Sequence, residues 1–147
     1  TPDGAPGSPP SAASRRSFWL PLALVAVTSL LAFPSTRGAI EEAVTRLRAE
    51  GLAVSSMHLR FLQPMPSGIR EILKRFKRVM TIEGNWSDKL EDELIDEDNR
   101  RYSALAMMLR SRFLVDIDCW SEARGQPIKP GDVVKAMRAK LNEGSPS

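Results

Sequence analysis

Cysteine and histidine are almost missing from this sequence of 147 residues, which has one of each, Cys119 and His58. A single cysteine excludes a disulfide within the chain and any zinc or iron–sulfur site built only from this chain's own thiolates. Because His58 lies within an apolar run, we expect a structural imidazole rather than a catalytic one. The composition therefore offers neither a catalytic triad nor a metal-binding cluster.

An excess of one charge is also missing. The 21 basic residues are nearly balanced by 18 acidic ones, and no basic stripe is interleaved with aromatic residues, which argues against nucleic-acid binding. A hydrophobic fraction of 42% and a charged fraction of 27% are typical of a globular domain, and the length suits one such domain plus a tail. The first residue is Thr1 rather than methionine, so we expect a processed or cropped chain, or the product of an incomplete gene.

The first 34 residues differ from the rest. Residues 1–17 contain four prolines and two glycines with almost nothing to bury, and we expect them to be disordered. The apolar segment at residues 18–34 follows Arg15 and Arg16 and has two interpretations. One is the first strand of the fold, over about residues 24–33; the other is a twin-arginine-like export signal or anchor at residues 14–33. The strand is favoured, because the apolar run is shorter than the roughly 18–20 residues that cross a bilayer as a helix.

From residue 35 onward, the apolar residues alternate between helical and strand spacing. Residues 35–51 predict an amphipathic helix with Ser35 or Thr36 as N-cap and Gly51 at its end. Residues 52–85 predict a β-α-β unit, with strands near 57–62 and 79–82 and a helix over 69–76 between them. A helix over 102–113, a strand over 115–119 and a helix over 130–141 follow, and residues 142–147 should fray. This alternation predicts an α/β fold, a three-layer α/β/α sandwich with a mostly parallel sheet, at residues 35–141.

Ligand-binding crevices of parallel α/β sheets open beyond the carboxyl ends of the strands. The residues at such positions are Gln63, Pro64 and Pro66 after one strand and Glu83 and Asn85 after the next. These five residues are candidates for a loop or interface surface, although turn formation and capping is the favoured interpretation for each. The sequence itself assigns no catalytic, cofactor-binding or metal-binding residue.

Three groups of charged residues have a functional and a simpler interpretation. The acidic loop at residues 86–101 has seven acidic residues against three basic ones. It could bind a metal or a basic partner, but a solvated loop is favoured because the residue spacing of a calcium-binding loop is missing. Asp116 and Asp118 could share a metal or a proton on one strand face, but no third ligand is visible. A basic group on the predicted helix is either solvated or a surface for a partner subunit: Arg70, Lys74, Arg75, Lys77 and Arg78.

Several motifs are familiar in their order and spacing. STRGAIEEAV at residues 35–44 is similar to G-S-T-x-G-x-I-x-E-A-V, HLRFLQPMP at 58–66 to H-L-R-x-L-x-P-x-P, and IEGN at 82–85 to V-E-x-N. NRRYSALAMMLR, VDIDCW and GQPIKPGDVV resemble a helix, a strand and a final G-x-P-x-x-P-x-x-V. Together they resemble the C-terminal domain of the alpha subunit of 2-oxoacid:ferredoxin oxidoreductases, which has a transketolase C-terminal-like fold. Phe33-Pro34 departs from the Trp-Gly pair that the family usually has before S-T-x-G.

The resemblance implies an enzyme complex that decarboxylates a 2-oxoacid, with 2-oxoglutarate as the expected one, on thiamine diphosphate. The complex forms an acyl-CoA from coenzyme A and passes electrons through an iron–sulfur cluster to ferredoxin. The resemblance also implies a beta subunit as partner and a cytoplasmic location. We expect this chain to be a fragment that binds no cofactor, is inactive alone and packs against the catalytic domains. The alternative class is a small exported or membrane-tethered α/β binding module with residues 14–33 as its signal.

Overall fold

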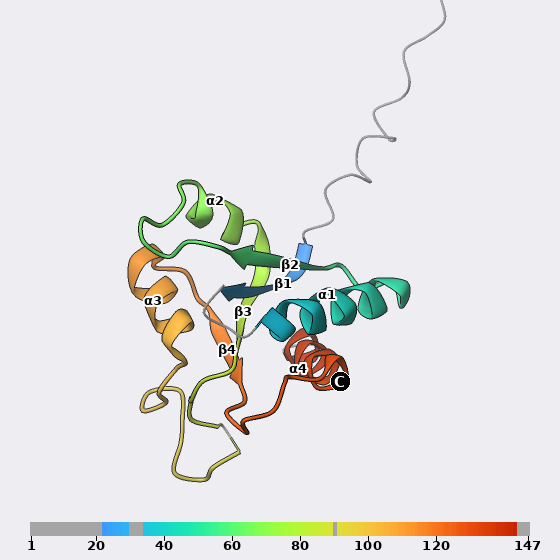
Figure 1. Ribbon diagram of the computed structural model, residues 1–147. Helices are drawn as coiled ribbons and strands as arrows, with labels where there is room; N and C mark the ends of the chain where they lie inside the picture. Colours follow the sequence, from blue (N-terminus) through green and yellow to red (C-terminus); the bar gives the residue numbers. More distant parts are fainter. Residues whose placement is uncertain (1–21, 30–33, 90, 144–147) are drawn as a thin grey trace, which may run out of the picture.

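The computed structural model describes residues 22–29, 34–89 and 91–143. These residues form a four-stranded sheet with helices on both sides (Figure 1). In chain order the elements are β1 (Leu22–Ser29), α1 (Pro34–Ala49), β2 (Val54–Leu59), α2 (Ile69–Leu73), β3 (Phe76–Glu83), α3 (Ala104–Phe113), β4 (Asp118–Ser121) and α4 (Pro130–Asn142).

The strand order is β2-β1-β3-β4, and each neighbouring pair is parallel. Leu24 of β1 is in register with Val54 of β2 on one side and Arg78 of β3 on the other, so β1 lies inside the sheet. Parallel strands require crossover connections, and the helices between the strands supply them. All carboxyl ends of the strands therefore lie at one edge, which we call the carboxyl edge.

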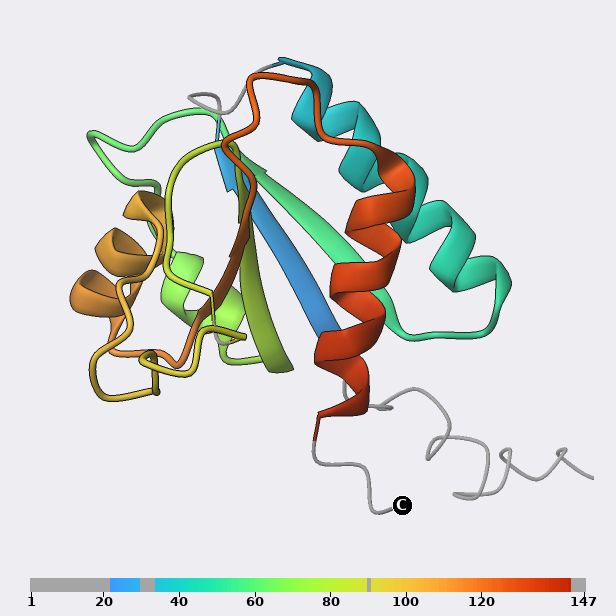
Figure 2. The ribbon, with the colours of Figure 1, turned by 90° about the horizontal axis from the view of Figure 1, so that it is seen from below.

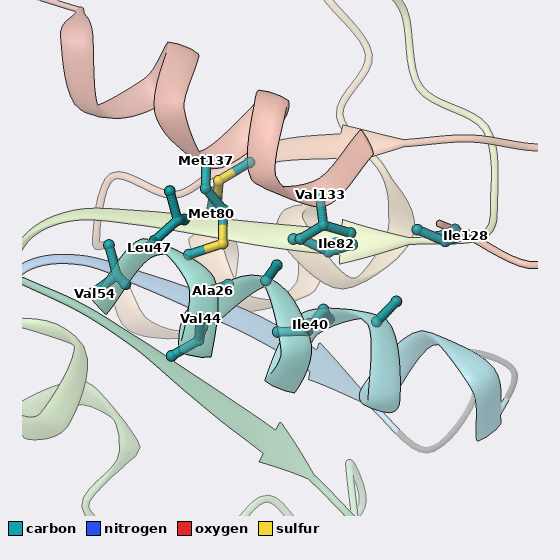
Figure 3. Close-up of a cluster of buried hydrophobic side chains, with 12 residues drawn as sticks. Ala26, Ile40, Val44, Leu47, Val54, Met80, Ile82, Ile128, Val133 and Met137 are labelled. Atoms are coloured by element: carbon teal, nitrogen blue, oxygen red, sulfur yellow. The ribbon is translucent and has the colours of Figure 1, made fainter. Parts of the chain in front are cut away.

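Two apolar cores hold the helices on the sheet, with α1 and α4 on one face and α2 and α3 on the other (Figure 2). Figure 3 shows the first core, in which Ile40 and Leu47 of α1 meet Val133 and Met137 of α4 over the strands. The second core joins α2 and α3 to β2, β3 and β4 through Leu59, Ile69, Leu73, Val79, Leu105, Ala106, Leu109, Ile117 and Cys119. The predicted three-layer α/β/α fold is confirmed.

The apolar N-terminal segment contributes a strand at Leu22–Ser29, where the sequence predicts one over about residues 24–33. It is an inner strand of a sheet whose two faces are covered by helices, and such strands are expected to be apolar on both sides. No helix among the described residues is long and apolar enough to cross a membrane. The predicted disorder of residues 1–17, the end of the predicted strand at 30–33 and the last residues of the tail, 144–147, lie outside the described residues.

Several element boundaries differ from the sequence prediction. Strand β2 spans Val54–Leu59 rather than residues 57–62, and three other differences have a clear cause. Helix α2 ends at Leu73 and Phe76 begins β3, because pairing of Phe76 with Leu22 of β1 extends the strand. Helix α1 begins at Pro34, a residue well suited to a first helical position, so Ser35 and Thr36 lie inside its first turn. Strand β4 begins at Asp118 rather than near residue 115, since its pairing with β3 starts there.

Candidate functional site at the carboxyl edge

Glu83 is the most heavily bonded side chain at the carboxyl edge, and it is 4% exposed. Its Oε1 accepts hydrogen bonds from Thr81 Oγ1 at 2.7 Å, from the Ala106 amide at 3.1 Å and from the Ser103 hydroxyl. Its Oε2 accepts from the Leu105 amide at 2.9 Å and from Asn85 Nδ2 at 2.8 Å. The carboxylate therefore has a donor for every lone-pair direction that it offers, and it ties the end of β3 to the start of α3.

Local sequence explains half of this arrangement. Thr81, Glu83 and Asn85 are two residues apart, and the period of a strand places such residues on one side of it. The other half comes from α3, whose N-cap Ser103 makes no side-chain hydrogen bond of its own to the helix. Because the first amides of a helix carry partial positive charge and lack partners within the helix, a buried carboxylate is well placed there.

The acidic loop, residues 86–101, is closed at its base by Asp88 and Arg101. The Asp88 amide donates to Arg101 O at 3.0 Å, the Arg101 amide donates to Asp88 Oδ2 at 2.9 Å, and the guanidinium of Arg101 contacts both carboxylate oxygens. Hydrogen bonds from the side chain and amide of Arg101 lower the pKa of Asp88 from 3.8 to about 2. This fork holds the two ends of the loop together at the carboxyl edge.

A second ionic group joins the loop to β4 and α4. Arg100, whose side chain is only 8% exposed, lies 2.7 Å from Asp118 Oδ1, and Lys140 Nζ lies 2.7 Å from Asp118 Oδ2. Burial alone would raise the pKa of Asp118, but hydrogen bonds from Lys140 and from the Cys119 amide, together with Arg100, hold that pKa below its usual value. Arg100 also donates to Cys119 O at 3.0 Å, so it bonds the backbone of the edge strand β4 as well.

The structure separates the five predicted site residues into two groups. Glu83 and Asn85 are hydrogen bonded to each other, whereas Gln63, Pro64 and Pro66 are exposed in the loop after β2. That loop contains a cis Gln63–Pro64 peptide bond. Strand β1 lies between β2 and β3, so the two groups flank the end of the central strand.

The other candidate residues have structural surroundings. His58 is half-buried in β2, and burial together with Arg37 and Arg60 lowers its pKa. Cys119 is buried, and its Sγ accepts the Ser103 amide at 3.4 Å. Asp116 and Asp118 do not share a site, because Asp116 pairs with Arg110 outside β4.

Two cavities adjoin the acidic loop. One of about 340 Å³ lies between the loop, β4 and α4, and one of about 540 Å³ lies between the loop and the segment that follows β4. Most carboxylates around them already have partners: Asp88 with Arg101, Asp118 with Arg100 and Lys140, and Glu122 with Arg124. Glu91, Asp92 and Asp132 also line the cavities and form no ion pair within the described part of the chain.

The donor set does not fit a metal centre or an iron–sulfur cluster. The described part of the chain contains no group of three histidine, cysteine, aspartate or glutamate residues that could hold a metal ion. Glu83 has no free oxygen for a ligand, and the single cysteine cannot supply four thiolates. The site is a structural anchor: its hydrogen bonds and ion pairs fix the position of the loops that leave β3 and β4.

Several residues of this anchor were missed by sequence reasoning. Thr81 shows a weak signal in its two-residue spacing from Glu83. Ser103 and Arg100 show no sequence signal, because they lie 20 and 17 positions beyond Glu83. The path of the acidic loop brings Ser103 to Glu83 and Arg100 to Asp118.

The fold and the site define a class of protein: a parallel α/β domain in which a buried glutamate holds the carboxyl edge together. The sequence matches the family model described as pyruvate:ferredoxin oxidoreductase core domain II over residues 26–117. It is 30% identical over 112 residues to the 2-oxoglutarate oxidoreductase subunit KorA of Mycobacterium tuberculosis, a match that covers 76% of this chain and 15% of that protein. The chain belongs to the pyruvate:ferredoxin oxidoreductase core domain II family.

A solved structure shares the fold. The 2-oxoglutarate:ferredoxin oxidoreductase from Magnetococcus marinus, with 2-oxoglutarate, coenzyme A and succinyl-CoA bound, matches with a TM-score of 0.64 and 23% identity. The match covers 81% of this chain and 18% of that one. This chain thus spans less than a fifth of the length of either relative.

Proposed function

We propose that this chain is the C-terminal, subunit-packing domain of the alpha subunit of a 2-oxoacid:ferredoxin oxidoreductase, with 2-oxoglutarate as substrate. The single observation that carries the proposal is the family match over residues 26–117, which extends from β1 almost to β4. The substrate is supported by the names of the two relatives, both of which are 2-oxoglutarate oxidoreductases.

In the proposed reaction, a 2-oxoacid, coenzyme A and two oxidised ferredoxins give an acyl-CoA, carbon dioxide, a proton and two reduced ferredoxins. Thiamine diphosphate and an iron–sulfur cluster would supply this chemistry from other domains of the complex. The residues of this chain support a structural role instead, because Glu83 and Asp118 are fully engaged in holding loops and Cys119 is buried. The chain would therefore orient the catalytic parts without contacting the reacting atoms.

The surface proposed for that packing is the carboxyl edge. Gln63, Pro64 and Pro66 are exposed there, and Asn85 is exposed although its amide group is anchored to Glu83. Prolines restrict the backbone of the first group, and the anchor restricts the second, so both present a preformed surface at low entropic cost. A beta subunit, and ferredoxin through it, would be reached from this side in a cytoplasmic complex.

A chimera tests the proposal. In the M. tuberculosis relative, the matched segment is replaced by residues 22–143 of this chain, and the product is co-expressed with its natural partner subunit. We expect an assembled complex that reduces a viologen dye in the presence of 2-oxoglutarate and coenzyme A. A graft with Glu83→Ala should lose assembly, whereas a graft with Glu42→Ala, on the exposed side of α1, should behave as the unaltered graft. Failure of the unaltered graft to assemble, although residues 22–143 unfold cooperatively on their own, contradicts the proposal.

The isolated chain provides a second test. With 2-oxoglutarate, coenzyme A, thiamine diphosphate and a viologen acceptor, we expect no dye reduction. Turnover without a second subunit would show that the domain contains reactive groups and would overturn the assigned role.

For the exported-module alternative, residues 14–21 and 30–33 of the predicted signal lie outside the described residues, and residues 22–29 form strand β1. Signal cleavage near residue 35 would remove β1, which pairs with both β2 and β3. Cell fractionation with N-terminal sequencing of the expressed chain separates the two functions, because the packing domain must retain residues 22–29.

A further inference from the structure

The exposed aromatic side chains of this domain gather at the carboxyl edge. The described ranges contain six aromatic residues, of which four are half-buried: Phe76, Tyr102, Phe113 and Trp120. The other two are Phe61, which is 67% exposed, and Trp86, which is 69% exposed. Aromatic residues are frequent anchors of protein interfaces, because each removes a large apolar area from water in one well-packed contact. At this edge the domain therefore has two anchor residues that nothing in the described part of the chain covers.

Both residues follow the end of a strand. Phe61 comes two positions after the end of β2, and Trp86 comes three positions after the end of β3. Figure 2 shows the loops that leave these two strands on the same side of the sheet, toward the top of the view. Strand β1 lies between β2 and β3, and neighbouring strands are about 4.8 Å apart, so the two strand ends lie about 10 Å from each other. One partner surface can span that distance.

The backbone on both sides of Trp86 is held by hydrogen bonds to the sheet. Asn85 donates to buried Glu83 at 2.8 Å, and the hydroxyl of Ser87 bonds that of Ser121, the last residue of β4. These contacts restrict the position of Trp86 before any partner binds. A preformed anchor of this kind loses less conformational entropy on binding than a residue in a free loop.

The surroundings of Trp86 suit a cationic side chain. Trp86 lines the cavity of about 540 Å³ between the acidic loop and the segment that follows β4. Besides two internal ion pairs, the cavity wall has the carboxylates of Glu91 and Asp92 against the single ammonium group of Lys89, and none of these three forms an ion pair within the described part of the chain. An indole ring is the best aromatic partner for a cation. Indole and excess carboxylate together fit an arginine or lysine side chain of another polypeptide.

Phe61 has a neighbour of the opposite charge. Arg60 is exposed and forms no ion pair with any described residue. The next acidic residue along the chain is Glu71, beyond the loop and within α2. A complementary surface would therefore meet Phe61 with an apolar pocket and Arg60 with a carboxylate.

We propose that Phe61 and Trp86 anchor the carboxyl edge on the beta subunit. That subunit presents an apolar pocket beside a carboxylate to Phe61 and Arg60, and a cationic side chain to Trp86 and its cavity. This contact depends on the packing role proposed above and adds to it the anchoring residues and the charge pattern of the partner. Because the charges beside the two anchors differ in sign, only one orientation of the beta subunit satisfies both.

Truncation of the anchors tests the contact in the graft of residues 22–143 into the M. tuberculosis relative. The readout is the dissociation constant of the graft from its natural partner subunit. We expect Phe61→Ala and Trp86→Ala each to raise it about 30-fold or more, as truncation of an interface anchor does. Trp86→Phe keeps an aromatic ring and should raise it less. Both side chains are exposed, so the midpoint of urea unfolding should not change.

A matched control removes an equally exposed apolar side chain elsewhere. Helix α3 begins at the carboxyl edge, so its C-cap Leu114, which is 81% exposed, lies at the far end. Leu114→Ala should bind the partner subunit as the unaltered graft does.

Charge reversal tests the orientation of the contact. Glu91→Lys and Arg60→Glu should each slow association about tenfold in about 0.1 M salt. The difference from the unaltered graft should disappear in about 1 M salt, where the Debye length is about 3 Å. Glu42→Lys, on the exposed side of α1, should associate at the unaltered rate.

The outcomes separate this contact from the packing role. If the unaltered graft binds and either alanine variant binds as tightly, the assigned anchors are wrong and the packing role stands. An unaltered graft that does not bind the partner subunit overturns both. Charge variants that associate at the unaltered rate in about 0.1 M salt overturn the charge pattern and, with it, the cationic side chain assigned to the cavity at Trp86.

Discussion

The carboxylate of Glu83 is the most direct test of how the carboxyl edge is held together. Replacing Glu83 with alanine removes the acceptor for the Leu105 and Ala106 amides, which begin α3 and have no partner within the helix. It also removes the acceptor for the buried hydroxyl groups of Thr81 and Ser103. Helix α3 and strand β3 then lose the hydrogen bonds through the carboxylate but keep their apolar contacts.

The magnitude follows from which donors can find another partner. The hydroxyl groups of Thr81 and Ser103 lie 3.4 Å apart and can turn toward each other, and Asn85 is exposed to water. The two helix amides remain buried without an acceptor, and an unsatisfied buried donor costs about 1–3 kcal/mol. We therefore expect Glu83→Ala to lower the free energy of unfolding by about 3–5 kcal/mol, roughly a third to a half of the total for a domain whose stability is about 10 kcal/mol. Glu83→Gln keeps one oxygen and should cost less, about 2–3 kcal/mol.

Urea unfolding followed by far-ultraviolet circular dichroism measures these losses, and hydrogen exchange of the Leu105 and Ala106 amides locates them. The matched control is Glu42→Gln, which removes an exposed ion pair with Arg46 on α1 and should cost about 0.5 kcal/mol or less. A loss below about 1 kcal/mol for Glu83→Ala, or unchanged protection of the two amides, would refute the reasoning.

Two further predictions concern the ionic groups around the acidic loop. Asp118→Asn leaves the buried Arg100 without its carboxylate, and in the same urea assay it should lower the free energy of unfolding by about 3 kcal/mol. Asp116→Asn, at a carboxylate that is 97% exposed, should lower it by less than about 1 kcal/mol, and equal losses for the two variants would contradict this account. For Asp88, the folded-state pKa of about 2 lies below the ordinary value of 3.8, so its fork with Arg101 is complete above about pH 4 and is lost as the pH falls toward 2. Carboxyl-carbon NMR should give a midpoint near 2 that rises in Arg101→Gln, and a midpoint near 3.8 in the parent chain would show that the fork does not form in solution.

The alternation of helical and strand spacing was sufficient to predict the three-layer fold, but two boundaries depended on strand pairing. Ile69, Leu73 and Phe76 fit one face of a helix, yet Phe76 begins β3 because its partner on β1 is available at that position. Consequently Lys77 and Arg78 belong to β3 and not to the outward side of α2, and Arg78 donates to the carbonyl of Lys140 on α4. Local spacing does not distinguish these outcomes, since an apolar residue at a helix end and one at a strand start look the same.

For the candidate site, the sequence correctly placed Asn85 after a strand, whereas Glu83 is the last residue of β3 rather than the first residue after it. It could not show that the carboxylate of Glu83 reaches the start of a helix 21 residues later, because the acidic loop between them has no periodic pattern that fixes its path. The two-residue spacing of Asp116 and Asp118 was likewise uninformative. Asp116 is exposed, whereas Asp118 joins β4 to the acidic loop and to α4, and this difference depends on where β4 begins.

By itself, then, the sequence determined which segments become strands and helices, because each must hide its apolar residues at its own characteristic spacing. It also determined that one cysteine cannot supply the four thiolates of an iron–sulfur cluster. Only the tertiary structure decided which polar groups meet: Glu83 with the start of α3, and Asp118 with Arg100 and Lys140. Apolar burial depends on local periodicity, whereas a hydrogen bond or ion pair depends on distances between segments that no local pattern records.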